Sequence, residues 1–582
     1  MHVVATAGHV DHGKSTLVRA LTGMEPDRWA EERRRGMTID LGYAWTTLPS
    51  GATLAFVDVP GHERFVPNML AGVGPVPAAM VVVAADEGWM PQSAEHLAAL
   101  DALDVTRGLL VVSRADLADP ARAAREARNA IARTSLGATE TVAVSAATGQ
   151  GLDDLRAALD RLVATLAPPD PTAPVRLWID RSFTIAGSGT VVTGTLGAGT
   201  LRQGDTLEAV GAVRVKGLQS LGRPEKEVAA VARVAVNLRN VAKDAFGRGD
   251  ALLTPGAFRH TDLVDVRVHG DAAADLPATL VFHIGSAAVA ATVRPLGKDT
   301  ARLRLQRPLP LRIGDRALLR DPGRHHVAGG VTVLDPVPPP LRRRGAAATR
   351  AADLATMDGR PDAAGELRRR GLMTGQDLKT LGVRVRAAPV TGDWHADPAF
   401  WADRRARLAA EVDRYLAAHP LEPGMPVEAL RRALDLPDRA LVAALTAPPL
   451  VTADGRVSRA GAAATVPEPI RRALAALDTD LRDRPFHAPD AARLKDLGLG
   501  PRELAAAVRA GALVRIADGI VLPPSAVEKA VAVLRAVPQP FTLSEARQAL
   551  DTTRRVAVPL LELLDRRGAT VRAPDDRRTV AG

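Results

Sequence analysis

The chain has 582 residues, of which 46% are hydrophobic, and a formal net charge of +10. This length suffices for three or four domains with ordinary hydrophobic cores. Because the chain contains no cysteine, disulfide bonds, thiol catalysis and cysteine-ligated metal centres are excluded, and any metal must be bound by oxygen or histidine. The positive charge favours a polyanionic partner, although an arginine-rich proteome would give a similar balance without one.

No apolar stretch approaches the roughly 20 residues that a bilayer-spanning helix needs. The first segment, MHVVATAGHV, lacks the basic region and the cleavage site of a secretory signal. We therefore expect a cytoplasmic protein that has no membrane partner and acts as a monomer.

Short apolar runs alternate with helical patterns through residues 1–170, as in AMVVVAADE followed by SAEHLAALDAL. This alternation predicts an α/β domain with a parallel sheet. After it, glycine-broken β-runs such as GTVVTGTLGAGTLRQGDTLEAV predict two β-barrel domains, at residues 171–258 and 259–340.

The proline-rich basic segment PVPPPLRRRG, residues 336–345, predicts a linker. Beyond it, a pattern of helix, turn, helix and β-hairpin recurs at residues 428–457, 492–520 and 545–577, with a degenerate fourth copy at 363–385. This order of elements is typical of winged-helix domains, and the tandem copies support one another. We predict tandem winged-helix (α+β) repeats over residues 341–582.

The segment GHVDHGKS, from Gly8 to Ser15, fits the phosphate-loop pattern G-x-x-x-x-G-K-[ST] and lies between an apolar run and a helical pattern. In such a loop the backbone N–H groups approach phosphate oxygens, Lys14 reaches the β- and γ-phosphates, and the Ser15 hydroxyl ligates Mg²⁺. The alternative is a glycine turn that simply precedes a helix.

A second candidate site lies in DVPGHERF, residues 58–65. Asp58 ends an apolar run and is placed to hold Mg²⁺ through a water molecule, while Gly61 can offer its N–H to a γ-phosphate. His62 is placed to orient the attacking water, although a lone histidine after a turn is usually a surface residue. Thr38 is a candidate Mg²⁺ ligand or, alternatively, a helix-capping or surface hydroxyl.

Base selection is expected at SRAD, residues 113–116, and at Ser145. Asp116 can accept hydrogen bonds from N1–H and the 2-amino group of guanine, a pair that adenine does not offer, so we predict GTP rather than ATP. The usual pattern here is Asn-Lys-x-Asp. Arg114 can still lay its stem on the base, whereas Ser113 lacks the amide that normally ties this loop to the phosphate loop.

Five segments are characteristic when considered together: GHVDHGKS, RRGMTIDLGYAW, DVPGHERFVPNMLAGVG, SRAD and DRSFTIAGSGTVVTGTLGAGTLRQGDTL. They resemble the selenocysteine-specific elongation factors (SelB), translational GTPases of the elongation factor Tu superfamily. The resemblance covers essentially the whole chain. It implies a GTPase that uses GTP and Mg²⁺, delivers selenocysteyl-tRNA to the ribosome at a recoded UGA codon, and binds a selenocysteine-insertion hairpin of the mRNA through its winged helices.

The resemblance also implies roles for individual residues. The nucleotide contacts would be Asp11, His12, Gly13, Lys14, Ser15, Thr16, Gly61, Ser113, Arg114, Asp116, Ser145 and Ala146. His62 would be the catalytic residue, with Val10 and Met37 as an apolar gate in front of it. The Mg²⁺ ligands would be Ser15, Thr38 and, through water, Asp58.

An aminoacyl pocket is expected in the second domain. A selenol is far more acidic than a hydroxyl and would be anionic near neutral pH, so its pocket should be cationic. Arg181 and Arg233 align with the family's pocket, beside Asp180 for the amino group. Either arginine could instead be an ordinary residue of the barrel surface.

In the last repeat, Arg554 and Arg555 lie at the predicted start of the second helix, and Arg572, Arg577 and Arg578 lie around the wing. Arginine can bind the phosphates of a folded RNA and stack on its exposed bases. We therefore expect this face to bind the hairpin. The alternative is a solvated basic face at a chain end.

Two other classes of protein remain open. The GTPase subunit of a sulfate-activating enzyme would share the GTPase domain and barrels, but it would not carry tandem winged helices. A regulatory switch that binds RNA or DNA would explain the tail and the charge, but it would leave the tRNA-carrier barrels without a role.

Overall fold

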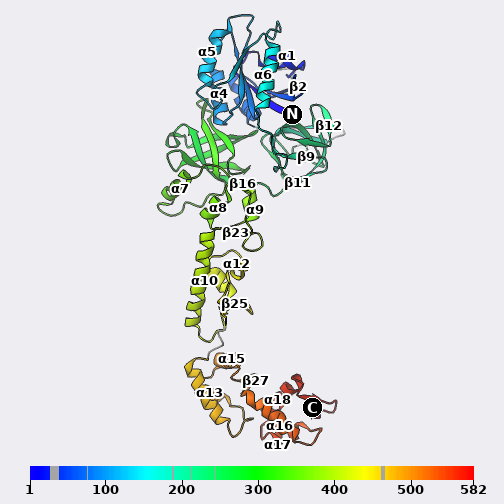
Figure 1. Cartoon of the computed structure of the whole chain (residues 1–582), viewed down its shortest axis with the longest axis vertical. Helices are drawn as coiled ribbons and strands as arrows, with labels where there is room; N and C mark the ends of the chain where they lie inside the picture. The colour runs from blue at the N-terminus through cyan, green and yellow to red at the C-terminus, as the bar shows by residue number, and fades with distance from the viewer. Residues whose placement is uncertain are drawn as a thin grey trace. The chain divides into compact units, whose positions relative to one another are not determined.

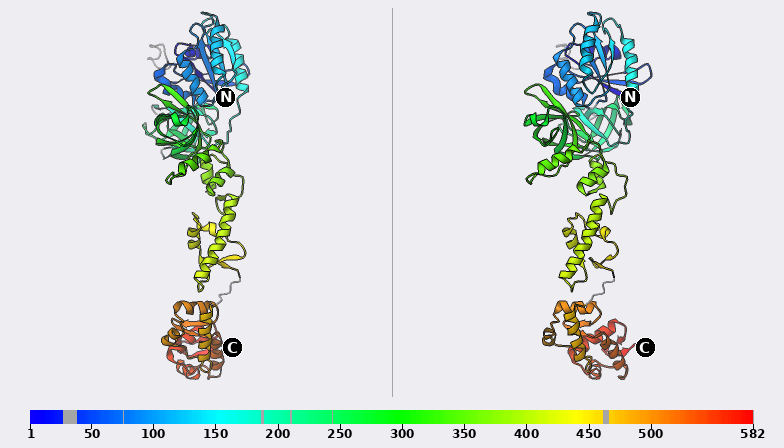
Figure 2. Two further views of the ribbon diagram at one scale, coloured as in Figure 1. Left: turned by 90° about the vertical axis from the view of Figure 1, so that its left-hand side faces the viewer. Right: turned by 60° about the vertical axis from the view of Figure 1, so that its left-hand side comes forward.

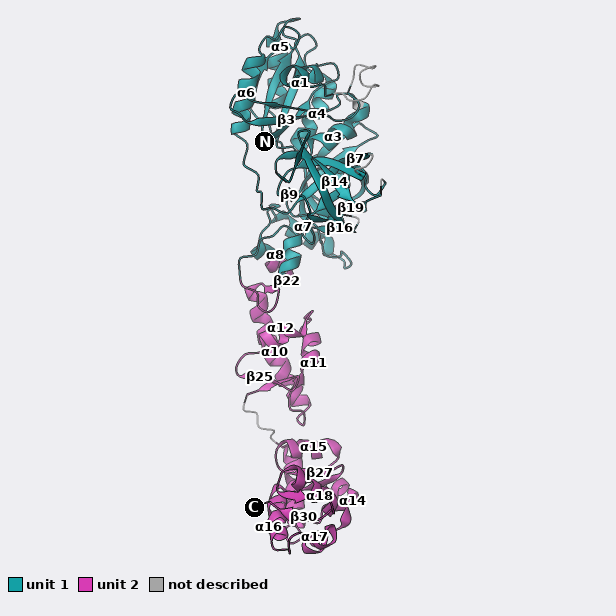
Figure 3. Ribbon diagram, turned by 90° about the vertical axis from the view of Figure 1, so that its right-hand side faces the viewer, with its two compact units in different colours: residues 1–366, 374–387 teal, residues 367–373, 388–582 magenta. Residues whose placement is uncertain are grey.

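The computed structural model describes residues 1–26, 38–74, 76–185, 189–209, 211–242, 244–460 and 466–581. Met37, half of the predicted apolar gate, lies outside these residues. The chain divides into two compact units, drawn in different colours in Figure 3. Unit 1 comprises residues 1–366 and 374–387, and unit 2 comprises residues 367–373 and 388–582.

Unit 1 begins with a six-stranded sheet in the order β2-β3-β1-β4-β5-β6. All neighbouring strands are parallel except β2 and β3, which are antiparallel. The strands are β1 (His2–Ala7), β2 (Gly42–Thr47), β3 (Thr53–Asp58), β4 (Ala78–Ala84), β5 (Gly108–Ser113) and β6 (Glu140–Ala143). The predicted parallel sheet is confirmed, with β2 as an antiparallel edge.

Helices cover both faces of this sheet (Figure 1). One face packs against α1 (Lys14–Thr22) and α6 (Leu152–Ala164), in a core that includes Phe56. The other face packs, around Val57, against α3 (Val66–Val73), α4 (Pro91–Ala102) and α5 (Pro120–Ile131), and the short η1 (Glu63–Phe65) precedes α3. Because both faces are covered, the strands are nearly continuous apolar runs.

The second domain closes into a barrel. Its sheet has the order β10-β15-β7-β8-β14-β11-β12, and the additional pairing of β10 with β11 closes the ring. The strands are β7 (Arg176–Ile185), β8 (Gly189–Leu196), β10 (Thr206–Ala209), β11 (Gly211–Ser220), β12 (Arg223–Glu225), β14 (Ala232–Arg239) and β15 (Ala251–Leu253). A separate two-stranded sheet is formed by β9 (Thr200–Arg202) and β13 (Glu227–Ala229).

The third domain is a closed barrel in the order β16-β19-β18-β17-β20-β21. Its elements are β16 (Arg259–Gly270), η2 (Ala273–Asp275), β17 (Thr279–Ile284), β18 (Ala287–Pro295), β19 (Thr300–Leu311), β20 (Arg316–Asp321) and β21 (His326–Asp335). Buried and more exposed residues alternate along β18, as a closed barrel requires. The two barrels lie side by side in Figure 1 and in the right-hand view of Figure 2, and Trp178 of β7 packs into the core of the third domain. Both predicted barrels are confirmed.

The segment predicted as a linker lies against the third domain. Arg302 donates a hydrogen bond of 2.9 Å to the carbonyl of Pro339. Arg350, in α7 (Ala346–Ala355), forms buried ion pairs with Asp265 at 2.7 Å and Asp335 at 2.6 Å. Since breaking a buried ion pair leaves an unpaired charge, these contacts hold the segment and α7 on the barrel.

Unit 2 contains three repeats of three helices followed by a β-hairpin. The first has α10 (Pro398–Ala418), α11 (Val427–Ala433), α12 (Arg439–Leu445), β24 (Met425–Pro426), β25 (Leu450–Ala453) and β26 (Arg456–Arg459). The second has α13 (Glu468–Asp480), α14 (Ala491–Asp496), α15 (Pro501–Arg509), β27 (Val514–Ala517) and β28 (Ile520–Leu522). The third has α16 (Pro524–Arg535), α17 (Leu543–Ala549), α18 (Arg554–Arg566), β29 (Thr570–Arg572) and β30 (Arg578–Val580). The predicted tandem winged helices are confirmed.

The degenerate fourth copy, residues 363–385, departs from this order. It contains α8 (Ala363–Arg370), β22 (Leu372–Thr374) and α9 (Gly375–Thr380), and β22 pairs with β23 (Trp394–Ala396). The boundary between the two units also runs through this segment. We therefore do not count it as a fourth winged helix.

Candidate functional site

The phosphate loop joins β1 to α1 and surrounds the ammonium group of Lys14. Lys14 Nζ donates hydrogen bonds to the carbonyls of Gly8 at 3.0 Å and His9 at 2.6 Å. A cavity of about 620 Å³ adjoins the loop. Most of the predicted nucleotide contacts line it, namely Asp11, Gly13, Lys14, Ser15, Thr16, Gly61, Ser113, Arg114, Asp116 and Ala146.

The three predicted Mg²⁺ ligands meet at the start of α1. Ser15 Oγ lies 2.9 Å from Thr38 Oγ1 and donates a hydrogen bond of 2.6 Å to the carboxylate of Asp58. Asp58 is fully buried and accepts a second hydrogen bond from Thr6 Oγ1 at 2.8 Å, which fixes its orientation. Mg²⁺ takes hydroxyl and carboxylate oxygens together with phosphate oxygens, so these residues fit the ion.

Gly61 lies directly against the phosphate loop. A Cβ atom at this position would lie 2.7 Å from the carbonyl carbon of His9 and would also collide with Lys14 Nζ. The side chain of His62 is half-buried, and it is not among the described residues that line the cavity. Its Nδ1 accepts a hydrogen bond from the N–H of Arg64 at 3.2 Å, so a role at the cavity requires the imidazole to move.

A serine ties the loop that is predicted to select the base, residues 113–116, to the phosphate loop. Ser113 Oγ donates a hydrogen bond of 2.7 Å to the carbonyl of His12. The Ser113 hydroxyl thus connects the two loops, although the sequence suggested that this connection needs the amide of an asparagine. Arg114 lines the cavity, while its guanidinium is held by Asp86 at 3.0 Å and Glu87 at 2.7 Å.

The other residues predicted to select the base differ in whether they line the cavity. Asp116 is exposed and lines the cavity together with Ala146. Ser145 is buried and does not line it, but its Oγ accepts a hydrogen bond of 3.1 Å from the N–H of Thr148, which shapes the turn. The sequence analysis missed Leu117, which is 65% exposed and offers the cavity an apolar face.

Two buried histidines support the phosphate loop from behind. His96 of α4 accepts a hydrogen bond of 3.0 Å from the N–H of Gly8, which is 88 residues away in sequence, so no local signal pointed to it. His12 was predicted to contact the nucleotide, but the structure places its ring under the loop, with Nδ1 3.2 Å from the carbonyl of Val82. Burial lowers the pKa of His96 to about 3 and that of His12 to about 4. Both rings are therefore neutral near neutral pH.

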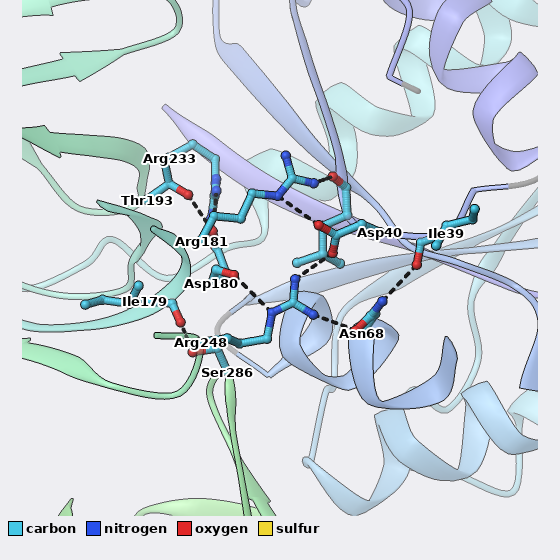
Figure 4. A network of polar contacts seen from close by, with 11 residues as sticks. Ile39, Asp40, Asn68, Ile179, Asp180, Arg181, Thr193, Arg233, Arg248 and Ser286 are labelled. Atoms are coloured by element: carbon cyan, nitrogen blue, oxygen red, sulfur yellow. Dashed lines mark hydrogen bonds and ion pairs between the residues drawn. The ribbon is translucent and has the colours of Figure 1, made fainter. Parts of the chain in front are cut away.

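A cluster of charged residues joins the GTPase domain to the second domain (Figure 4). Arg233 forms an ion pair with Asp180, which also accepts a hydrogen bond of 2.6 Å from Thr193. Arg181 forms an ion pair of 3.0 Å with Asp40, which lies two residues before β2, the edge strand of the GTPase sheet. The structure therefore brings the three predicted pocket residues together and adds Asp40, which the sequence analysis did not single out.

The ring of Tyr43, on β2, lies against both pocket arginines. The guanidinium carbon of Arg233 is 3.8 Å from the ring centroid, and that of Arg181 is 5.3 Å from it. These distances are in the range of cation–π attraction. Burial raises the pKa of Tyr43, so its hydroxyl stays protonated. A cavity of about 250 Å³, also lined by Phe183, adjoins these residues.

In the last repeat, Arg554 and Arg555 are exposed at the start of α18, where the sequence placed them. Arg577 is also exposed. Arg572 forms an ion pair of 2.5 Å with Asp576, so this wing arginine has a counterion of its own.

Arg578 differs from the other arginines of the last repeat. It is 6% exposed and forms an ion pair of 2.9 Å with Asp565. The expectation that it belongs to the RNA-facing surface is wrong, because its guanidinium is used inside the domain.

Three segments match families that have been described in other proteins. Residues 1–165 match "Elongation factor Tu GTP binding domain". Residues 261–340 match "Selenocysteine-specific elongation factor, beta-barrel domain", and residues 532–579 match "Elongation factor SelB, winged helix".

The chain is 34% identical over 472 residues to the selenocysteine-specific elongation factor of Escherichia coli, a match that spans 76% of this chain and 74% of that protein. The chain belongs to the selenocysteine-specific elongation factor family. The family member from Desulfomicrobium baculatum is 36% identical over 359 residues, 59% of this chain and 57% of that protein. A crystal structure of a bacterial selenocysteine-specific elongation factor covers 100% of both chains, with a TM-score of 0.76 and 25% identity.

Membership of the selenocysteine-specific elongation factor family places the chain among the translational GTPases. It implies GTP as the nucleotide for the cavity beside the phosphate loop. Among the described helices, none combines the length and the apolar character of a membrane span.

Proposed function

We propose that this chain, in its GTP-bound form, delivers selenocysteyl-tRNA to the ribosome at a recoded UGA codon. The observation that carries the proposal is the charged cluster between the GTPase domain and the second domain. Among the described side chains of this cluster, three guanidinium groups face two carboxylates, those of Arg181, Arg233, Arg248, Asp40 and Asp180. These side chains therefore carry one positive charge in excess.

An excess of one positive charge suits an aminoacyl group with a monoanionic side chain. A selenol is ionised near neutral pH and a serine hydroxyl is not, so Coulomb attraction favours selenocysteine over serine. The ion pair with Asp180 and the contact with Tyr43 fix the guanidinium of Arg233 before any ligand arrives. A fixed charge loses less conformational entropy on binding than a mobile one.

In the GTPase domain, GTP supplies the phosphoryl group that is transferred to water, and Mg²⁺ neutralises its charge. We propose that Lys14 binds the β- and γ-phosphates and that Asp116 accepts hydrogen bonds from guanine. His62 would orient the attacking water once the imidazole moves towards the cavity. The Mg²⁺ ligands would be Ser15, Thr38 and, through water, Asp58.

We further propose that each part of the chain has one task. Residues 1–170 bind GTP, residues 171–258 hold the aminoacyl end of the tRNA, and residues 259–340 form the third domain that supports them. The winged helices within residues 341–582 bind the selenocysteine-insertion hairpin of the mRNA. Because ribosomes, tRNA and mRNA meet in the cytoplasm, we expect the chain to act there, as a monomer.

The test measures ternary complex formation with selenocysteyl-tRNA and seryl-tRNA, both on the same tRNA body and with a non-hydrolysable GTP analogue. We expect selenocysteyl-tRNA to bind at least about tenfold more tightly, equivalent to about 1.4 kcal/mol. Arg233→Ala should remove most of this difference. Arg202→Ala is the matched control, because Arg202 lies in the same barrel but is exposed and pairs with Glu227. Equal affinities of the parent for the two tRNAs would contradict the proposal.

A further inference from the structure

Asp40 stands between the nucleotide site and the aminoacyl pocket. It follows Thr38, whose Oγ1 is 2.9 Å from Ser15 Oγ, by only two residues. Its carboxylate accepts hydrogen bonds from Arg181 Nε at 3.0 Å and from Arg248 Nη2 at 2.6 Å (Figure 4). One carboxylate therefore serves two arginines of the second domain.

Arg248 extends this connection to the helix that follows His62. It donates hydrogen bonds to Asn68 Oδ1, on α3, at 2.5 Å and to the carbonyl of Asp180 at 3.0 Å. Asn68 Nδ2 in turn donates to the carbonyl of Ile39 at 2.8 Å. The segment after Thr38, the start of α3 and the pocket strand β7 are thus joined in one network.

The network is sensitive to the presence of the Asp40 charge. Asp40 and Arg181 are each 18% exposed, so solvent screens their attraction only partly. The two guanidinium groups lie against the same carboxylate, that of Arg181 at 3.0 Å and that of Arg248 at 2.6 Å. Removing this carboxylate would leave two partly buried cations without the anion that they share.

We propose that Asp40 is a positioning residue that couples the nucleotide site to the aminoacyl pocket. Contacts at Ser15 that hold Thr38 also hold Asp40 beneath Arg181 and Arg248, and release of Thr38 withdraws the shared carboxylate. Binding at either site then changes affinity at the other by the same factor, as thermodynamic linkage requires. This inference rests on the proposed function, because it assumes that Arg181 belongs to an aminoacyl pocket.

The test uses the full chain with Asp40→Asn, which keeps the shape of the side chain and removes its charge. The dissociation constant of selenocysteyl-tRNA is measured with a non-hydrolysable GTP analogue and with GDP. We take the ratio of the dissociation constant with GDP to the dissociation constant with the GTP analogue. We expect this ratio to fall at least tenfold relative to the parent, because Asp40→Asn weakens binding mainly in the GTP-analogue complex. An unchanged ratio would overturn the proposal.

Asp315→Asn is the matched control. Asp315 is 11% exposed and pairs with Arg176 at 2.6 Å, so this variant also breaks a partly buried ion pair between two domains. It lies outside the network, so we expect it to leave the ratio unchanged. A similar fall in both variants would show that general loosening of the domains, rather than Asp40, sets the coupling.

A second measurement separates failure of this inference from failure of the proposed function. Hydrogen exchange of residues 39–45 is compared between the GTP-analogue and GDP forms without tRNA. We expect the nucleotide-dependent difference to shrink in Asp40→Asn and to persist in Asp315→Asn. One outcome is that the parent binds no selenocysteyl-tRNA while the exchange difference still shrinks in Asp40→Asn and persists in Asp315→Asn. In that case the proposed function fails and the connection through Asp40 stands. If the difference persists in Asp40→Asn, the connection itself is refuted.

Discussion

Ser113 Oγ donates a hydrogen bond of 2.7 Å to the backbone carbonyl of His12, which lies 101 residues earlier in the chain. The bond joins the end of β5, where the sequence predicts that the base is selected, to the phosphate loop. Both residues are buried, so water cannot readily replace the bond. The two ends of the nucleotide site are therefore held in one geometry by a hydroxyl.

Ser113→Ala should weaken GTP and GDP binding to a similar extent, because the hydrogen bond between Ser113 and His12 does not involve Gly61, the predicted contact of the γ-phosphate. A loss of about 1 kcal/mol, or roughly fivefold in affinity, is the usual scale for one such bond. Nucleotide titration by calorimetry measures it. Ser135→Ala is the control, since Ser135 Oγ bonds to the carbonyl of Val105 at 2.9 Å away from the site. Parental affinity in Ser113→Ala would show that the loop is held by other contacts.

His62→Ala should leave GTP affinity nearly intact, because the imidazole is not among the described residues lining the cavity. Ribosome-stimulated hydrolysis should fall by at least about a hundredfold, the scale on which a positioned catalytic group acts. Single-turnover hydrolysis on programmed ribosomes provides the measurement. Arg64→Ala changes an exposed neighbour and should hydrolyse GTP like the parent. A normal rate in His62→Ala would rule out the water-orienting role.

Gly61→Ala should weaken GTP binding more than GDP binding. The added Cβ would lie 2.7 Å from the carbonyl carbon of His9 and collide with Lys14 Nζ, so the loop would have to move. Overpacking of this kind costs about 1–3 kcal/mol, which corresponds to a loss of affinity between roughly fivefold and a hundredfold. Gly217→Ala is the control, because a Cβ there meets nothing within 4 Å. Equal losses for both nucleotides would argue against a γ-phosphate sensor at Gly61.

The GTPase sheet should lose stability as the pH falls from about 6.5 towards 4. Burial lowers the pKa of His96 to about 3 and that of His12 to about 4. The unfolded chain therefore binds protons in this interval that the folded chain does not, and the free energy of unfolding falls by up to about 1.4 kcal/mol per pH unit for each histidine. Above pH 6.5 both states are neutral and the effect disappears.

His96→Asn should make this pH dependence shallower, because the amide oxygen can accept the Gly8 N–H without titrating. Hydrogen exchange of the β1 amides, corrected for the intrinsic pH dependence of exchange, reports the opening of the sheet. His326→Asn alters an exposed histidine of the third domain and should leave the pH profile of β1 unchanged. An unaltered profile in His96→Asn would mean that other groups cause the pH dependence.

Replacing Arg554 and Arg555 together by alanine should weaken binding of the cognate hairpin by about 1–3 kcal/mol, with a smaller effect on non-cognate RNA. Arg572→Ala should cost less, since Arg572 already pairs with Asp576. Affinity of the full chain is measured over a range of salt concentrations, because phosphate contacts make it fall as salt rises. If the folded double variant binds the hairpin as tightly as the parent, recognition lies on an earlier repeat.

The sequence by itself determined those features that depend on neighbouring residues. Apolar runs that alternate with helical patterns specified the parallel sheet, and GHVDHGKS specified where the phosphate loop lies between β1 and α1. The repeated helices and hairpins specified the winged helices. These patterns are readable because local periodicity reflects which face of an element is buried.

Only the tertiary structure decided which distant groups meet. Arg181 and Arg248 are 141 and 208 residues from Asp40, and their common contact depends on how the barrel of the second domain packs beside β2. Tertiary packing likewise decides that Ser113 bonds to the phosphate loop and that the guanidinium of Arg578 pairs with Asp565 inside its domain. A side chain's type limits what it can bind, but its partner is set by the burial and packing of whole domains, for which sequence spacing carries no signal.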